Sequence, residues 1–104
     1  MNPKLNAFVT KDLVAQKKKI NFMYREELDN TQDSGWRFFS GDETQQDVDN
    51  ADNILQDTIE NIINQIDSSI EKYLNNEVGS VFERKNSESE FIKVENFEFG
   101  KNLE

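Results

Sequence analysis

The 104-residue sequence contains no cysteine, no histidine, only four glycines and a single proline. Without cysteine the chain can form neither a disulfide nor a thiolate metal site, and it has no cysteine nucleophile. Without histidine it lacks the commonest general base, the serine–histidine–aspartate triad and most transition-metal sites. Four glycines also provide no glycine-rich phosphate-binding loop. These absences predict that the protein is not an enzyme and that it carries no cofactor.

Long apolar runs are also missing. None approaches the roughly 20 residues that a membrane span requires, and the first residues, MNPKLNAFVTKDLV, lack the apolar region of a signal peptide. We therefore expect a cytoplasmic protein that binds no membrane.

Mean hydropathy is low, at −0.85, but eleven periodically placed aromatic residues favour one folded domain over residues 1–104, with an ordered core over about residues 7–95. The final pair, Leu103-Glu104, fits either native sequence or a cloning remnant.

Negative charge is concentrated in one segment. The chain carries a net charge of −9, and residues 42–77 contain ten acidic side chains and only one basic side chain, Lys72. Residues 1–41, by contrast, carry a net charge of +2. An acidic surface repels phosphates and attracts basic partners. We therefore expect no nucleic-acid binding and a protein partner of basic character.

Alternating apolar residues predict two β-hairpins. Residues 20–27 (INFMYREE) and 35–39 (GWRFF) have a period of two and are separated by a polar loop, which is typical of an antiparallel pair. Residues 78–85 (VGSVFERK) and 91–96 (FIKVEN) predict the second hairpin. Residues 6–15 predict a short strand or a pair of strands.

The segment between the hairpins predicts short helices. Gly41 suits a turn dihedral that other residues resist, and Asp42 can cap a short acidic helix that begins near Glu43. An amphipathic helix follows, with apolar residues at spacings of one, three and four: Ile54, Leu55, Ile59, Ile62, Ile63 and Ile66. Ser68 and Glu71 can form a capping box that starts another helix. The sequence thus predicts an α+β domain in which an antiparallel sheet of two hairpins has two or three short helices packed on one face.

The aromatic strand offers two candidate partner-binding residues. Alternation places Trp36 and Phe38 on one face of the strand, with Trp36 mostly buried, and Arg37 and Phe39 on the other face. Arg37, like Arg25, has two interpretations. Each can form a surface cross-strand salt bridge, or it can anchor a partner interface, where arginine beside aromatic residues is enriched.

The acidic side chains that follow this strand complete the candidate site: Asp42, Glu43, Asp47, Asp49 and Asp52. Residues 47–58 begin like a calcium-binding loop, but Ala51 occupies a ligand position and Thr58 the position of the bidentate glutamate. We therefore reject an EF-hand and predict no metal site. A weak divalent-cation site and a simply solvated acidic surface remain as alternatives.

Residues 22–45, FMYREELDNTQDSGWRFFSGDETQ, resemble a bacterial family grouped with immunity protein thirty-three of polymorphic toxin systems. The resemblance rests on Tyr24–Glu27, Asp33–Phe39 and Gly41–Glu43, and it covers about residues 7–94. It implies an immunity protein, whose partner is a cognate protein toxin.

The leading hypothesis is a non-catalytic, cytoplasmic binding protein that neutralises a cognate toxin by occluding it, with Trp36, Arg37 and the acidic side chains at the interface. A small ligand-sensing or regulatory domain is the first alternative. A divalent-metal enzyme is the second, and it requires clustered carboxylates around an ordered ion.

Overall fold

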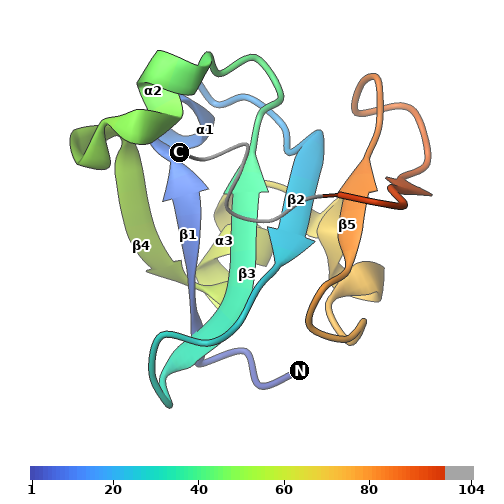
Figure 1. Cartoon of the computed structure of the whole chain (residues 1–104). Helices are drawn as coiled ribbons and strands as arrows, with labels where there is room; N and C mark the ends of the chain where they lie inside the picture. The colour runs from blue at the N-terminus through green and yellow to red at the C-terminus, as the bar shows by residue number, and fades with distance from the viewer. Residues whose placement is uncertain (98–104) are drawn as a thin grey trace.

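Six strands form one sheet in the order β4-β1-β3-β2-β5-β6 in the computed structural model, which describes residues 1–97 (Figure 1). The strands are β1 (Asn6–Thr10), β2 (Phe22–Arg25), β3 (Asp33–Phe39), β4 (Ile54–Thr58), β5 (Val81–Glu83) and β6 (Ile92–Lys93). The helices are α1 (Lys11–Ala15), α2 (Gln45–Asp49) and α3 (Ile59–Gln65), with the 3₁₀ helices η1 (Ala51–Asn53) and η2 (Ser68–Tyr73). The Leu103-Glu104 pair lies outside the described residues.

Both predicted hairpins are present, and the α+β class is confirmed. Strands β2 and β3 pair antiparallel, as do β5 and β6, and β2 joins the two hairpins by pairing with β5. The prediction of an antiparallel sheet of two hairpins is nevertheless incomplete, since the sheet has two further strands and one parallel pair. Strand β1 lies between β3 and β4, parallel to the first and antiparallel to the second. Sequence patterns missed this arrangement because neither partner of β1 adjoins it in the chain.

Strand β3 is the centre of the sheet, and all seven of its residues are buried. Its side chains alternate between the two faces of the sheet as predicted. Trp36 and Phe38 join the main hydrophobic cluster, whereas Phe39 joins a smaller cluster with Tyr24 and Val81. The sheet therefore has an apolar face on each side, and the face that carries Trp36 and Phe38 packs against most of the core.

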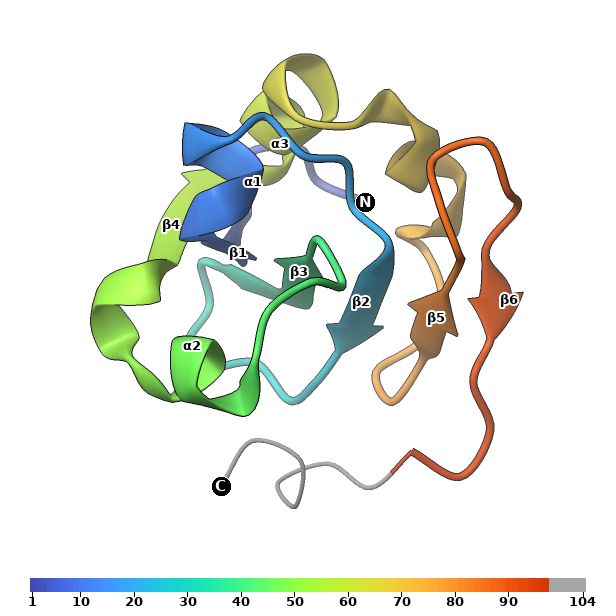
Figure 2. The same ribbon diagram turned by 90° about the horizontal axis from the view of Figure 1, so that it is seen from above.

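Helices cover both faces rather than the single face predicted. Figure 2 shows α1 and α3 on one side of the sheet and α2 on the other. Leu13 of α1, Ile59 and Ile62 of α3, and Ile70 of η2 contribute to the main cluster. On the opposite side Val48 of α2 packs against the smaller cluster.

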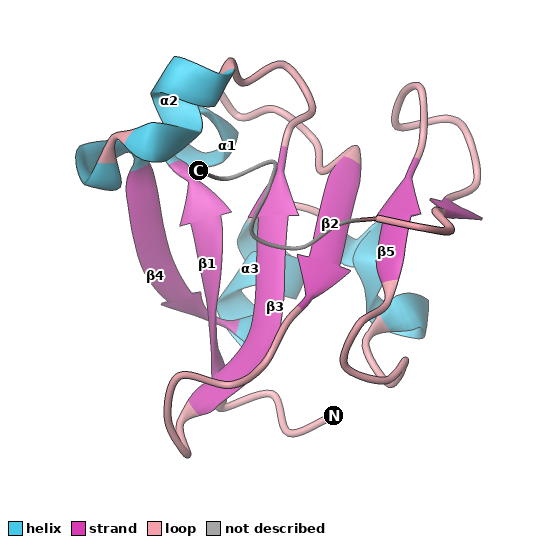
Figure 3. Cartoon of the chain, in the orientation of Figure 1, coloured by secondary structure: helices cyan, strands magenta, loops and turns pink. Residues whose placement is uncertain are grey.

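The predicted amphipathic helix is a strand followed by a helix. Ile54–Thr58 pairs with β1, and α3 begins only at Ile59 (Figure 3). Thr58 separates the two elements, since its side chain accepts a hydrogen bond from the N–H of Asn61 and caps the helix. The predicted break between two helices is present after α3, where Asp67, rather than Ser68, caps η2.

Helix α2 also begins later than predicted. Its cap is Thr44, not Asp42, and the capping box pairs Thr44 with Asp47. The backbone N–H of Asp47 donates to the Thr44 hydroxyl at 3.1 Å, and the Asp47 carboxylate accepts from the Thr44 N–H at 3.0 Å. Gly41 has a φ of +92°, so its predicted role in the turn is confirmed.

Candidate functional site

Trp36 is a core residue, as expected from the alternation. Its side chain is 0% exposed, and its indole N–H donates to the Leu74 carbonyl oxygen at 3.1 Å. The ring lies against Phe38 and Phe82. Trp36 therefore has no exposed surface in this structure through which it could contact a partner.

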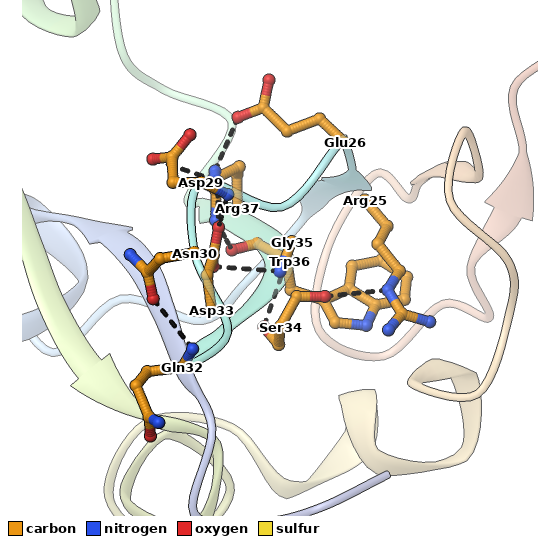
Figure 4. A network of polar contacts seen from close by, with 10 residues as sticks. All are labelled: Arg25, Glu26, Asp29, Asn30, Gln32, Asp33, Ser34, Gly35, Trp36 and Arg37. Carbon is orange, nitrogen blue, oxygen red and sulfur yellow. Dashed lines mark hydrogen bonds and ion pairs between the residues drawn. The ribbon is translucent and has the colours of Figure 1, made fainter.

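Arg37 lies in a buried polar cluster rather than on the surface (Figure 4). Its two terminal nitrogens donate to the two carboxylate oxygens of Asp33 at 2.9 and 2.8 Å, and its Nε donates to Glu26 at 2.6 Å. The guanidinium also lies 4.4 Å from the centre of the Phe8 ring. The interpretation of Arg37 as half of an exposed salt bridge is therefore wrong, since its side chain is only 5% exposed.

The carboxylate of Asp33 is held ionised by this cluster. Burial alone would raise its pKa, but hydrogen bonds from Arg37 and from the backbone N–H groups of Asp29 and Gly35 lower the pKa of Asp33 to about 2. Arg25 lies nearby and donates to the carbonyl oxygens of Ser34 and Asn76. Both arginines thus connect elements of the fold.

The acidic turn after β3 is ordered by one inward-pointing carboxylate. Glu43 accepts hydrogen bonds from the N–H groups of Ser40 and Gly41 at 2.8 and 2.9 Å, and its carboxylate also contacts the Thr10 hydroxyl. Asp42 remains exposed and lies 3.3 Å from the Lys18 ammonium. Of this pair, only Asp42 presents its carboxylate mainly to solvent.

A second carboxylate supports the turn from helix α1. Asp12 accepts hydrogen bonds from the hydroxyls of Ser40 at 2.6 Å and Thr10 at 2.7 Å. Burial would raise its pKa, but these hydroxyls and the Lys18 charge lower the pKa of Asp12. An open pocket of about 260 Å³ lies over this network, and its lining includes Lys18, Asp42, Glu43 and Asp47. Asp12 and its neighbours thus fix the base of the acidic segment.

The remaining acidic side chains predicted for the site lie on α2 and η1. Asp47, Asp49 and Asp52 are all exposed, and the side chain of Asp49 accepts a hydrogen bond from Gln45 at 2.9 Å. With Asp42 they form a surface, here called the acidic ridge, on the segment between β3 and β4. The structure thus places four of the seven predicted site residues on an exposed surface and turns Trp36, Arg37 and Glu43 inward.

No sequence pattern pointed to three polar residues that support the ridge. Thr10, Asp12 and Ser40 meet only because β1 lies parallel to β3, which brings the carboxyl ends of both strands together. Ser40 follows the end of β3, and Asp12 lies in the first turn of α1 after β1. Knowledge of the parallel pairing would have placed these residues side by side.

The carboxylates of residues 1–97 include no group of three or more arranged to hold a metal ion. Over the same residues, no helix is long and apolar enough to cross a membrane. The chemistry available at the acidic ridge is therefore that of exposed carboxylates, which attract cationic groups.

Together, the fold and this surface define a small acidic α+β domain with an exposed, negatively charged segment. Residues 7–95 match the model of the immunity protein Imm33 domain, and the chain belongs to that family. The resemblance of the Tyr24–Glu43 motifs to this family is thereby confirmed. Comparison with curated proteins and with solved structures finds no match for the chain.

Proposed function

We propose that this protein is a non-catalytic, cytoplasmic immunity protein that neutralises a cognate protein toxin by binding to it and covering its functional surface. The acidic ridge is the proposed contact surface, and the partner is a toxin domain of basic character. The observation that carries this proposal is the exposure of Asp42, Asp47, Asp49 and Asp52 on one segment of an Imm33 immunity domain.

The charge distribution supports this surface over others. Residues 42–71 include nine acidic side chains and no lysine or arginine, whereas basic residues are interspersed through the rest of the chain. A toxin that acts on nucleic acid must attract phosphates, and an acidic inhibitor can imitate that charge. Complementary charges also steer the two proteins together and raise the association rate.

The ridge stands on ordered backbone, which favours a binding role. The capping box at Thr44 and Asp47 fixes the start of α2, and Glu43 holds the turn at Ser40 and Gly41. Carboxylates on a pre-organised backbone lose little conformational entropy when a partner binds. Trp36 and Arg37, which are buried, would support such a surface indirectly by fixing β3.

A charge-reversal experiment tests the proposal. The partner for this experiment is a candidate toxin domain, sought first among the products of genes next to this one and purified in an inactive form. The double variant Asp49→Lys/Asp52→Lys should lower the association rate by about tenfold at low salt, since two attractive charges become repulsive. The measurement is stopped-flow or surface-plasmon binding kinetics at several salt concentrations.

The matched control is Glu27→Lys/Glu88→Lys, which changes the net charge equally at two exposed sites away from the ridge. It should alter the association rate by less than about threefold. Equal effects of the two double variants would show that only the overall charge matters. Failure of the wild-type protein to bind or neutralise the toxin domain would refute the proposed function itself.

A further inference from the structure

Strand β4 forms one edge of the sheet. Among the described residues it pairs only with β1, and Figures 1 and 2 both show no other ribbon along its outer side. An edge strand presents backbone N–H and C=O groups that can pair with another chain.

The hydrogen bonds at the end of β4 determine which of its backbone groups point away from β1. The Ile59 N–H donates to the Leu5 carbonyl oxygen at 2.9 Å, and the register places Asn6 opposite Thr58. In an antiparallel pair, every second residue exchanges hydrogen bonds with its partner strand. Leu55 and Asp57 therefore pair with β1. The alternate residues Ile54, Gln56 and Thr58 point their backbone groups outward.

Gln56 is the central outward residue. The outward N–H of Ile54 donates to the Ala51 carbonyl oxygen, and that of Thr58 donates to the Asp57 carboxylate at 2.8 Å. Both ends of the strand are thus closed by local contacts, but Gln56 is exposed and lies at the middle of the edge. Its N–H and C=O are placed to form a pair of hydrogen bonds with an incoming extended segment.

We propose that β4 accepts an extended, basic segment of the toxin as an additional strand, paired to the backbone of Gln56. This inference rests on the proposed function and deepens it. Acidic residues flank the edge at both ends, with Asp52 before β4 and Asp57 and Glu60 at its close, and residues 42–71 contain no basic residue. Because Glu60 already pairs with Lys4 at 3.1 Å, the negative charge offered to a partner is mainly that of Asp52 and Asp57. Lysine or arginine side chains on the added strand would face these carboxylates.

A second copy of this chain is a poorer occupant of the same edge. Antiparallel pairing of two β4 strands would bring the two sets of flanking carboxylates together, and like charges across strands are destabilising. The charge of the edge therefore selects a cationic partner.

The substitution Gln56→Pro tests the pairing. Proline removes the N–H and is tolerated at edge-strand positions whose N–H faces solvent, so the bonds between β4 and β1 stay intact. We expect it to weaken binding of the same candidate toxin domain by about tenfold, because one backbone hydrogen bond and the local strand geometry are lost. The control Gln56→Thr keeps the N–H and suits a strand, and it should change the affinity by less than about threefold.

Amide hydrogen exchange of the wild-type protein gives a measurement that needs no substitution. In the free protein the Gln56 amide should exchange faster than those of Leu55 and Asp57, which are bonded to β1. When the toxin domain is bound, the Gln56 amide should slow by at least about tenfold. This result stands even if the proline variant does not fold.

The outcomes separate this inference from the proposed function. Tight binding by the wild type, with no loss in Gln56→Pro and unchanged exchange at Gln56, would overturn strand addition while leaving the immunity role in place. A dimer of the protein alone that Gln56→Pro dissociates in analytical ultracentrifugation would assign the edge to a second copy. Absence of any binding or neutralisation by the wild type would overturn both.

Discussion

At the scale of single residues, the buried cluster around Arg37 joins β3 to Glu26, which follows β2, and to Phe8 of β1. Asp33 and Arg37 lie on β3 and meet through two hydrogen bonds, and Gly35 between them has a φ of +86°. A Cβ atom at Gly35 would lie 2.5 Å from the Glu26 carbonyl oxygen. Removal of one partner from a buried ion pair leaves an uncompensated charge and costs about 3–5 kcal/mol. The cluster is therefore a structural requirement of the central strand.

The low pKa of Asp33 predicts a dependence of stability on pH. Because its pKa is about 2 in the folded protein and about 4 in an unfolded chain, the contribution is present above pH 4 and is lost as the pH falls towards 2. The size should be about 2 kcal/mol. About 1 kcal/mol of it is lost between pH 7 and pH 3, and Asp33→Asn should remove this loss when urea unfolding is measured at the two pH values.

Asp29→Asn is the control for that experiment. The Asp29 carboxylate is 3.8 Å from the same guanidinium, and its side chain is 64% exposed, so its ion pair should contribute little. If the two variants lose the same acid sensitivity, the cluster as a whole, rather than the buried carboxylate, is responsible.

At the scale of elements, residues 54–66 show where sequence patterns are sufficient and where they are not. The apolar spacing from Ile54 to Ile66 fits a helix throughout, yet the first five residues form β4 because β1 offers them a partner strand. The hairpin of β2 and β3 was predictable, since its alternation and turn are local. The parallel pairing of β1 with β3, which assembles Thr10, Asp12 and Ser40, depends on contacts between distant segments.

The two threonine caps should differ in their effect on stability. Helix α3 buries Ile59 and Ile62, whereas α2 has no buried residue. Thr58→Ala should therefore lower the free energy of unfolding by about 1 kcal/mol, because its helix belongs to the cooperative core. Thr44→Ala should chiefly raise local hydrogen exchange in α2 and change global unfolding by less than about 0.5 kcal/mol. Thermal unfolding and amide exchange of both variants provide the test.

At the scale of the whole molecule, the acidic ridge is expected to oppose stability, whatever it contributes to the proposed binding. Like charges on one segment repel one another, and Asp49 lies in the last turn of α2, where the helix dipole also disfavours an acid. Selection for a basic partner can retain such residues at a cost in stability.

Neutralising the ridge should therefore have opposite effects on folding and binding. Asp49→Asn/Asp52→Asn should stabilise the free protein by roughly 0.5 kcal/mol at low salt, and this gain should fade by about 0.5 M salt. The same variant should bind the toxin domain more weakly. Thermal unfolding across a salt series, together with the affinity, checks both effects. A less stable variant at low salt would contradict the repulsion argument.

The position of β1 also has a consequence for protein synthesis. This strand lies inside the sheet, yet both of its neighbours, β3 and β4, come later in the chain. A growing polypeptide must therefore leave the ribosome at least as far as Thr58 before β1 can gain its second partner. Pairing between distant segments is also slow. The outer edge of β4 can thus form only after residues 6–58 have been made, so strand addition at this edge, as proposed, cannot begin before that point.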